Sequence, residues 1–299
     1  MSDSLVIENL SKTYPNGVRA LQGVSLEIPT GMFGLLGPNG AGKSSLMRTI
    51  ATLQEADSGS IRLGDIDVLK EKQKVRTMLG YLPQDFGVYP NVDPLTLLTH
   101  FASLKGIASA SDRKKVVEAL LKRVNLWDVR KKKLGGFSGG MRQRFGIAQA
   151  LLGDPRIVIV DEPTAGLDPE ERNRFLNLLS EIGENVVIIL STHIVEDVAD
   201  LCRKMAVISN GRVLTQADPL ESIAGMRGKT WRKVVDRDEL EAHEAEYNVI
   251  STRLVAGRRV LHVFSETRPH DSFDPVEPDL EDVYFELLRR DRQSLGAAA

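Results

Sequence analysis

Apolar residues recur along this chain in two patterns, as short continuous runs and as positions spaced three and four residues apart. The continuous runs predict buried β-strands, and the spaced positions predict helices with one apolar face. Buried strands that alternate with helices indicate a parallel sheet covered on both faces, which is an α/β fold. The expected strands are 32–36, 61–63, 79–82, 157–160, 186–190 and 204–209, and the expected helices are 45–52, 170–182 and 194–202.

Two segments interrupt this alternation before residue 218. Leu5–Ile7 and Val24–Ile28 have the apolar character of strands, and Pro15-Asn16-Gly17 supplies a turn between them. They predict an antiparallel β subdomain that opens with a hairpin. From about 84 to 153 the apolar positions keep mostly helical spacing, which predicts a helical subdomain inserted into the α/β domain. The first domain is therefore expected to span residues 1–218.

Asp218-Pro219 ends the alternating pattern, and the chain beyond it is more charged and less apolar. We predict a small α+β accessory domain over 219–292. The last residues, 293–299, end in Gly-Ala-Ala-Ala and are expected to be a disordered tail. Within the accessory domain the expected strands are 231–235, 249–255 and 259–264, and the expected helices are 238–245 and 280–289.

Composition narrows the class of protein. The 299 residues are 42% hydrophobic with a formal net charge of −2, so the charge balance gives no sign of general nucleic-acid binding. Cys202 is the single cysteine, which excludes a disulfide within the chain and suits a reducing compartment. The first ten residues lack the basic and apolar regions of a signal peptide, and no apolar run approaches the roughly 20 residues of a membrane span. Any role at a membrane is thus expected to need a partner.

The strongest chemical signal is a glycine-rich loop between an expected strand and an expected helix. Its sequence matches G-x-x-x-x-G-K-[ST], and the flanking elements make a chance glycine-rich turn a poor explanation. Such a loop points backbone N–H groups at phosphates, and the helix adds its positive end. Lys43 can reach the β- and γ-phosphates of a nucleotide, and the Ser44 hydroxyl can bind Mg²⁺. The expected phosphate contacts are Gly37, Pro38, Asn39, Gly40, Ala41, Gly42, Lys43, Ser44 and Ser45.

A pair of acids follows a buried strand. Asp161 and Glu162 come directly after four apolar residues, which places a carboxylate at the edge of the sheet where ligands bind. Asp161 would hold Mg²⁺, and Glu162 would polarise the attacking water as a general base. Alone, this pair is equally well explained as surface acids at the end of a core strand. Together with the phosphate loop, it favours nucleotide hydrolysis.

The sequence Ser138-Gly139-Gly140 lies about twenty residues before Asp161. By itself it is better explained as an ordinary helix cap. In combination with the other motifs it resembles the signature loop of ABC ATPases, whose usual form is LSGGQ. Here Phe137 replaces the leading leucine and Met141 replaces the glutamine. The resemblance implies that the serine hydroxyl and the glycine amides bind the γ-phosphate of ATP held by the opposite subunit.

Four further residues stand where this family has functional groups. Taken alone, each has an ordinary structural explanation in a turn, a loop or a cap. The resemblance implies that Tyr14 stacks on adenine and that Gln84 senses the metal and the γ-phosphate. It further implies that Asp168 couples two sites across a dimer, although a helix cap is an equally natural role because Pro169 follows. His193 would bridge the γ-phosphate and the general base.

The resemblance covers residues 5 to about 215 and implies a P-loop NTPase of the ABC ATPase type. Such a protein binds ATP and Mg²⁺, hydrolyses ATP as a dimer, here expected to be a homodimer, and drives a separate integral membrane permease. The permease would be contacted through residues 84–130, which places the chain at the cytoplasmic face of the inner membrane. Residues 278–285 resemble the closing helix of ATPases from exporters of drugs, antibiotics, Na⁺ or polysaccharide, so export is expected.

Two alternatives stay open. A soluble ABC ATPase that acts on DNA or ribosomes usually has two cassettes or a long coiled-coil insertion. This chain has one cassette, and the interval from Gln84 to Ser138 is too short for a coiled coil. A regulatory ATPase with a degenerate site is disfavoured because Lys43, Glu162 and His193 are all present. The basic run 130–133 is expected to be a solvated face rather than a nucleic-acid or lipid contact.

Overall fold

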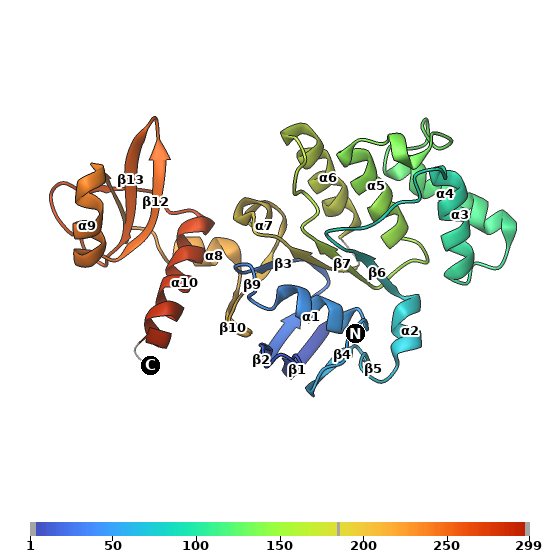
Figure 1. The fold of residues 1–299 in the computed structure, drawn as a ribbon, viewed down its shortest axis with the longest axis horizontal. Coiled ribbons are helices and arrows are strands. Elements are labelled where there is room, and N and C mark those ends of the chain that lie inside the picture. The colour runs from blue at the N-terminus through green and yellow to red at the C-terminus, as the bar shows by residue number, and fades with distance from the viewer. Residues whose placement is uncertain (1–3, 184–185, 297–299) are drawn as a thin grey trace.

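The computed structural model describes residues 4–183 and 186–296. In these ranges the chain forms three β-sheets with helices packed around them. Figure 1 shows the C-terminal residues at one end of the long axis and the inserted helices at the other. Every helix in the described ranges is too short or too polar to traverse a lipid bilayer.

The central sheet gives the molecule its α/β character and confirms the predicted fold class. Within the described residues its strand order is β10-β9-β3-β8-β7-β6, and all neighbours are parallel except the edge pair of β9 and β10. The strands are β3 (Gly31–Leu36), β6 (Leu79–Leu82), β7 (Ile157–Asp161), β8 (Val187–Ser191), β9 (Lys204–Ser209) and β10 (Arg212–Ala217).

The parallel strands are buried on both faces because their side chains alternate between two apolar cores. In β7, Val158 and Val160 join one core, while Ile157 and Ile159 join the other. This explains why these strands are continuous apolar runs in the sequence. The first core lies against α5 (Gly139–Ala150), α6 (Pro169–Ile182) and α7 (Val195–Leu201). The second lies against α1 (Lys43–Ile50) and the N-terminal sheet.

The N-terminal sheet is antiparallel, as predicted, and has the order β2-β1-β4-β5. Its opening hairpin turns at residues 15–17, where Gly17 adopts a left-handed φ of 84°. The hairpin strands are longer than the sequence pattern indicated because their outer halves are partly exposed and carry polar residues. The elements of this region are β1 (Leu5–Thr13), β2 (Arg19–Ile28), β4 (Ser58–Leu63), β5 (Ile66–Asp67) and α2 (Lys72–Thr77).

The segment between β6 and β7 is helical, and its helices begin at side-chain caps. Asp93 accepts a 2.9 Å hydrogen bond from the Thr96 amide and precedes Pro94 at the first helical position. Leu98 and Leu121 continue the first apolar core into this segment. Besides α5, it contains α3 (Pro94–Leu104), α4 (Ala110–Arg123) and the 3₁₀ turn η1 (Leu134–Gly136).

Residues 219–296, here named the appendage, form a third sheet that is antiparallel with the order β12-β13-β11-β14. Asp218 caps the first appendage helix through the Leu220 amide at 2.8 Å. A small apolar cluster around Leu261 and Phe273 lies on the sheet. The elements are α8 (Pro219–Ala224), β11 (Thr230–Val235), η2 (Arg237–Glu239), α9 (Leu240–Glu246), β12 (Val249–Val255), β13 (Arg258–Phe264), β14 (Asp274–Pro275) and α10 (Leu280–Gly296).

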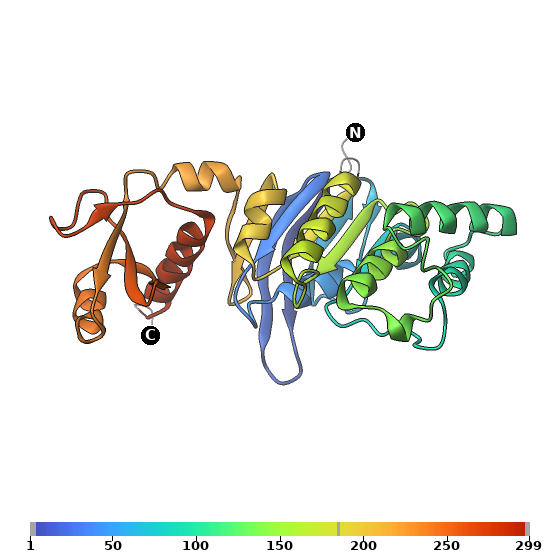
Figure 2. The ribbon, with the colours of Figure 1, turned by 90° about the horizontal axis from the view of Figure 1, so that it is seen from above.

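Helix α10 joins the appendage to the rest of the molecule. It lies against the appendage sheet on one side (Figure 2) and against α7 and β9 on the other. Leu280, Val283 and Tyr284 are part of the first apolar core. The prediction of a disordered tail over 293–299 is wrong for 293–296, where α10 continues because contacts of Asp291 with the main domain hold its end. Residues 297–299 lie outside the described residues.

Cys202 lies at the end of α7 and is buried as a free thiol. Burial raises its pKa to about 12, with the nearby carboxylate of Asp197 acting in the same direction. At neutral pH the side chain is therefore a neutral apolar group of the core.

Candidate nucleotide-binding and catalytic site

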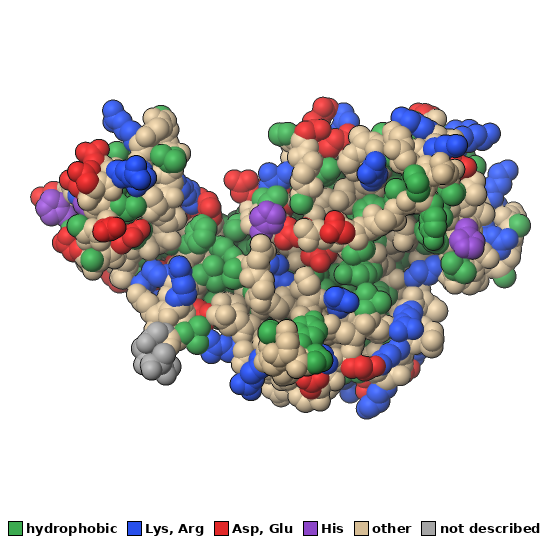
Figure 3. Space-filling model, in the orientation of Figure 1, with side chains coloured by type: hydrophobic (Ala, Val, Ile, Leu, Met, Phe, Trp, Pro, Cys, Tyr) green, Lys and Arg blue, Asp and Glu red, His purple; other side chains and the backbone are tan. Residues whose placement is uncertain are grey.

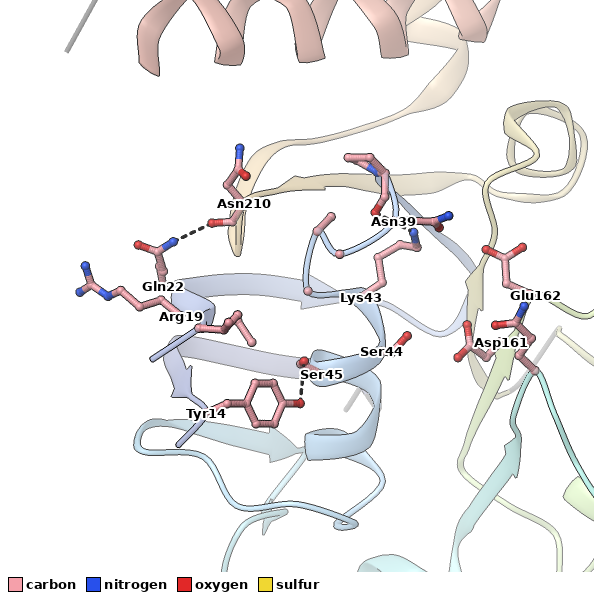
Figure 4. A pocket seen from close by; sticks show the side chains of 17 residues that line it. Tyr14, Arg19, Gln22, Asn39, Lys43, Ser44, Ser45, Asp161, Glu162 and Asn210 are labelled. Carbon is pink, nitrogen blue, oxygen red and sulfur yellow. Dashed lines mark hydrogen bonds between the residues drawn. The ribbon is translucent and has the colours of Figure 1, made fainter. Parts of the chain in front are cut away.

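A cleft of about 590 Å³ opens at the carboxyl ends of β3 and β7. Most of the predicted phosphate and metal contacts meet here, from elements far apart in the sequence (Figure 4). This is the edge of a parallel sheet at which α/β proteins bind ligands. The lining residues are Tyr14, Val18, Arg19, Ala20, Gln22, Pro38, Asn39, Gly40, Ala41, Gly42, Lys43, Ser44, Ser45, Gln84, Asp161, Glu162 and Asn210.

The phosphate loop, residues 37–44, wraps the start of α1. Gly42 precedes the helix with a φ of 109°, and a Cβ there would collide with the Ala20 carbonyl oxygen. Glycine is therefore required by both backbone conformation and space. The first turn of α1 carries no acidic residue, so its amides and the positive end of the helix dipole are free to attract phosphate.

The Lys43 ammonium folds over this loop and donates to the carbonyl oxygens of Gly37 and Pro38. Burial lowers the pKa of Lys43, while the charges of Glu162 and Asp161 oppose that shift. The lysine is thus held in a desolvated position beside two carboxylates. A cation in such a place interacts strongly with a phosphate anion, because little water screens it.

Two carboxylates stand at the end of β7. Burial raises the pKa of Asp161, and the neighbouring charge of Glu162 adds to the rise. Glu162 has a left-handed φ of 48°, and its amide donates to the Ser191 carbonyl at 2.8 Å. A non-glycine residue in this conformation is strained and is typical of functional sites.

His193 follows the neighbouring strand and meets Glu162. Its Nδ1 atom lies 2.6 Å from Glu162 Oε2, and its backbone amide lies 3.4 Å from the same oxygen. The imidazole is 62% exposed, whereas the Glu162 side chain is 9% exposed. The structure therefore brings together the two residues that the family resemblance paired.

Tyr14 lies at the far end of the cleft from these acids. Its hydroxyl contacts Ser45 Oγ at 2.9 Å and donates to Gln54 Oε1 at 3.0 Å. These bonds fix the ring beside the first turn of α1, with one part of it facing the cleft. An aromatic ring so placed is able to stack on a planar base.

Besides His193, five predicted residues do not line this cleft: Gly37, Ser138, Gly139, Gly140 and Asp168. Ser138 caps α5 by accepting from the Met141 amide at 3.2 Å, and Asp168 caps α6 by accepting from the Glu171 amide at 2.9 Å. Both caps agree with the structural explanation considered for them. Gly139 borders a separate groove that also contains Gln84, which thus lines both spaces. Gly37 contributes a carbonyl that accepts a hydrogen bond from Lys43, and Gly140 lies in the first turn of α5 beside Glu171.

A buried carboxylate, Asp197, which the sequence pattern did not predict, connects the loop before Asp168 to α6 and α7. Asp197 is fully buried in α7 and accepts 2.7 Å and 2.8 Å hydrogen bonds from Thr164 Oγ1 and Arg172 Nε. Thr164 lies between the catalytic acids and Asp168, and Arg172 lies on α6. The sequence offered no signal for this network, because an acid in a helix is normally solvent-exposed.

The wall of the cleft formed by Gln22 and Asn210 was not predicted from the sequence either. Gln22 Nε2 donates to the Asn210 carbonyl at 2.7 Å, and the two residues are 188 positions apart. Val18 lies at the mouth of the cleft with an exposed apolar side chain. Asn-Gly is a common turn sequence, but the contact of the 210–211 turn with β2 depends on packing that no local pattern reports.

A phosphate loop, two acids at the end of a central strand and a histidine on one of them define a P-loop ATPase. Comparison with known proteins narrows the class. Residues 21–165 match the family described as ABC transporter. Over 210 residues the chain is 36% identical to the uncharacterized ABC transporter ATP-binding protein YxlF of Bacillus subtilis (strain 168), covering 70% of this chain and 69% of that protein. The chain belongs to the ABC transporter family, as a protein that binds and hydrolyses ATP.

Other relatives and solved structures agree. The linearmycin resistance ATP-binding protein LnrL of Bacillus subtilis (strain 168) is 29% identical over 96% of this chain and 98% of its own length. The probable multidrug ABC transporter ATP-binding protein YbhF of Escherichia coli (strain K12) is 29% identical over 96% of this chain and 53% of its own length.

Among solved structures, cbiO1 from Clostridium perfringens, part of the ABC transporter complex cbiONQ, superposes with a TM-score of 0.68 at 30% identity, covering 74% of this chain and 90% of that one. The ATP-binding cassette MJ0796, a dimer bound to ADP and Pi, superposes with a TM-score of 0.65 at 26% identity. The match covers 72% of this chain and 98% of that one.

Proposed function

We propose that this chain powers export through a separate integral membrane permease by forming an ATP-bound dimer with a second copy of itself. The observation that carries the proposal is the separation of the phosphate loop from the signature loop, residues 137–141. Lys43 lines the cleft, whereas Ser138 and Gly139 do not. The donors expected to complete the γ-phosphate site therefore come from a second subunit.

ATP would lie along the cleft, with its base near Tyr14 and its phosphates over the start of α1. Tyr14 offers a ring face and Val18 an exposed apolar side chain to the purine. Lys43 would exchange its carbonyl partners for the β- and γ-phosphates. Glu162, held by His193, accepts a proton from the attacking water. Each role uses a side chain already at the correct end of the cleft.

The cleft also suits Mg²⁺. Ser44, Gln84 and Asp161 all line it, and their hydroxyl, amide and carboxylate oxygens are the ligand types that this ion prefers. We assign them as its protein ligands. The bound ion would neutralise charge on the β- and γ-phosphates. Burial raises the pKa of the Asp161 carboxyl, and a bound Mg²⁺ would stabilise the charged form that burial disfavours.

The dimer is tested with Glu162→Gln, which should retain ATP but not consume it. Light scattering with ATP is expected to show a dimer, and without ATP a monomer. Adding Ser138→Ala to this variant should weaken the dimer by removing a γ-phosphate donor. Ser109→Ala is the matched control, because Ser109 also caps a helix, α4, but lies away from the cleft. Persistent monomer with ATP, or equal effects of Ser138→Ala and Ser109→Ala, would contradict the proposal.

The chain would sit at the cytoplasmic face of the inner membrane, where residues 84–130 would contact the integral membrane permease. Tyr89 and Leu104 are exposed apolar side chains of this region, at 62% and 71% exposure. Export is supported by the relatives, which include proteins named for linearmycin resistance and multidrug transport. Exposed apolar side chains of this kind suit contact with a helix from another protein.

Affinity purification from mild-detergent extracts tests this partner. A multi-spanning membrane protein should accompany the wild-type chain and be lost from the double variant Tyr89→Ala, Leu104→Ser, whose ATPase activity should persist. Leu254→Ser is the matched control, because Leu254 is equally exposed but lies in the appendage. Recovery of ribosomal or DNA-repair proteins without a membrane protein would instead indicate a soluble ABC ATPase.

A further inference from the structure

The turn formed by Asn210 and Gly211 is built into the nucleotide cleft. The Gly211 amide donates to the carbonyl oxygen of Ala41 in the phosphate loop at 2.9 Å, and its own carbonyl accepts from the Gln22 amide at 2.8 Å. Both turn residues have left-handed backbones, with φ of 48° and 72°. A Cβ at Gly211 would press on the Ala20 backbone, so the turn packs directly on β2 and only glycine fits at this position.

The same turn is held from its outer side by the last part of the chain. Asp291, on α10, accepts a 3.2 Å hydrogen bond from Asn210 Nδ2 and forms a 3.0 Å ion pair with Arg212 Nη2. The two partners flank Gly211 in the sequence. Figure 4 shows Asn210 beside Gln22 and beneath the C-terminal helix. Asp291 is only 7% exposed, so water screens this pair weakly.

We propose that Asp291 is a positioning residue for nucleotide binding, which fixes the 210–211 turn and, through it, the phosphate loop and the wall of the cleft. The proposal rests on the function assigned to this cleft above. It gives the appendage a defined connection to the ATP site. A partner that moves α10 would change the affinity of the cleft for nucleotide without touching the nucleotide.

The physical reason lies in the chain of contacts. Asp291 orders Asn210 and Arg212, and the turn between them bonds to Ala41 in the phosphate loop. Without the carboxylate, the turn must be ordered when nucleotide binds, and part of the binding free energy is then lost. The catalytic pair Glu162 and His193 follows β7 and β8, so the chemical step should not depend on this contact.

The test measures binding of a fluorescent ATP analogue with Mg²⁺ to the full-length chain, together with kcat and KM for ATP. Asp291→Ala should raise Kd and KM about three- to tenfold, because only part of the stabilisation lost with a charge-assisted hydrogen bond reaches the nucleotide site. The value of kcat should stay within about twofold of wild type. Asp291→Asn should restore most of the affinity, because its amide keeps an acceptor for Arg212 and can pair with the Asn210 side chain.

Two controls separate positioning from general loosening of the helix. Ser294→Ala removes a hydrogen bond one turn further along α10, to the Asp291 carbonyl, without touching the turn, and should leave Kd unchanged. Arg212→Ala removes the partner from the turn side and should weaken binding as Asp291→Ala does, which covers the case in which Asp291→Ala fails to fold.

The outcomes are distinct. Wild-type Kd in both Asp291→Ala and Arg212→Ala would overturn the proposal, as would equal losses in Asp291→Ala, Asp291→Asn and Ser294→Ala. If the wild-type chain itself failed to bind the ATP analogue, or bound it as well as Lys43→Ala does, the function assigned to the cleft would fall first. A normal wild-type Kd with no Asp291 effect would remove this inference alone.

Discussion

The Nδ1 atom of His193 lies 2.6 Å from Oε2 of Glu162, although the two residues are 31 positions apart and follow different strands. β7 and β8 are parallel neighbours in register, with Asp161 paired to Ser191. The residues just beyond them therefore emerge at the same edge of the sheet. The contact is a consequence of topology, and it places an exposed imidazole on a buried carboxylate.

Replacing Glu162 by glutamine should separate binding from hydrolysis. The amide keeps the size of the side chain but cannot accept a proton, so the ATPase rate should fall about 10²- to 10⁴-fold, the usual contribution of a general base. Binding of ATP should remain within a few-fold of wild type. Phosphate release and equilibrium binding measure the two quantities. A rate within tenfold of wild type would show that another group activates the water.

The His193→Ala variant should lose activity without losing stability. The imidazole is largely exposed, and exposed substitutions usually change the free energy of unfolding by less than about 0.5 kcal/mol. The Glu162 side chain would lose its partner, so kcat should fall at least about tenfold. Thermal unfolding and steady-state kinetics are the readouts. A large fall in Tm would assign His193 a structural role instead.

Asp161→Asn should stabilise the nucleotide-free protein. Burial raises the pKa of this carboxyl, so above that pKa the folded state contains a charge that it disfavours. Removing the charge should raise Tm at neutral pH by about 2–4 °C, near 1 kcal/mol for a chain of this size. As the pH falls through the raised pKa, the wild-type group takes up a proton and the difference should shrink. A lower Tm for Asp161→Asn at neutral pH would contradict this account.

Asp197→Ala should destabilise the protein and disorder the loop before Asp168. The carboxylate is fully buried and accepts from Thr164 and Arg172, so its loss leaves the partly buried Arg172 guanidinium with only the exposed Glu196 as an acidic partner. We expect the free energy of unfolding to fall by about 3 kcal/mol, as for other broken buried pairs. Urea unfolding measures this loss. Glu196→Ala is the control, because Glu196 also contacts Arg172 but is mostly exposed, and it should have little effect.

The sequence allowed the phosphate loop and the acids after β7 to be predicted because each requires a local pattern of residues beside an apolar run. Lys43 and Asp161 then had to meet, since parallel strands end at one edge of a sheet. Gln22 and Asn210 could not be predicted as neighbours. They contact each other through a side chain and a carbonyl 188 residues apart, and neither residue type marks such a contact.

The signature loop shows the same limit. Phe137 replaces the usual leucine of this family, and the structure buries its ring in the first apolar core. A local motif reports which residue is unusual but not what surrounds it. The length of α10 was underestimated for a related reason, because the contact of Asp291 with Arg212 that secures its end is a tertiary one.

An apolar hollow lies between α7 and α10 (Figure 3). It is a groove of about 520 Å³, with His193 at its rim and Tyr284 on its wall. Cys202 lies at the end of the same helix, α7. Cys202 is buried and its pKa is raised to about 12, so it forms almost no thiolate at neutral pH and we expect it to react far more slowly with maleimides than an exposed cysteine. The natural chain thus serves directly as a background for site-specific labelling. A single cysteine placed at an exposed position such as Leu254 would carry a dye or spin label alone, and the distance between two such labels would report how two copies approach each other during ATP turnover.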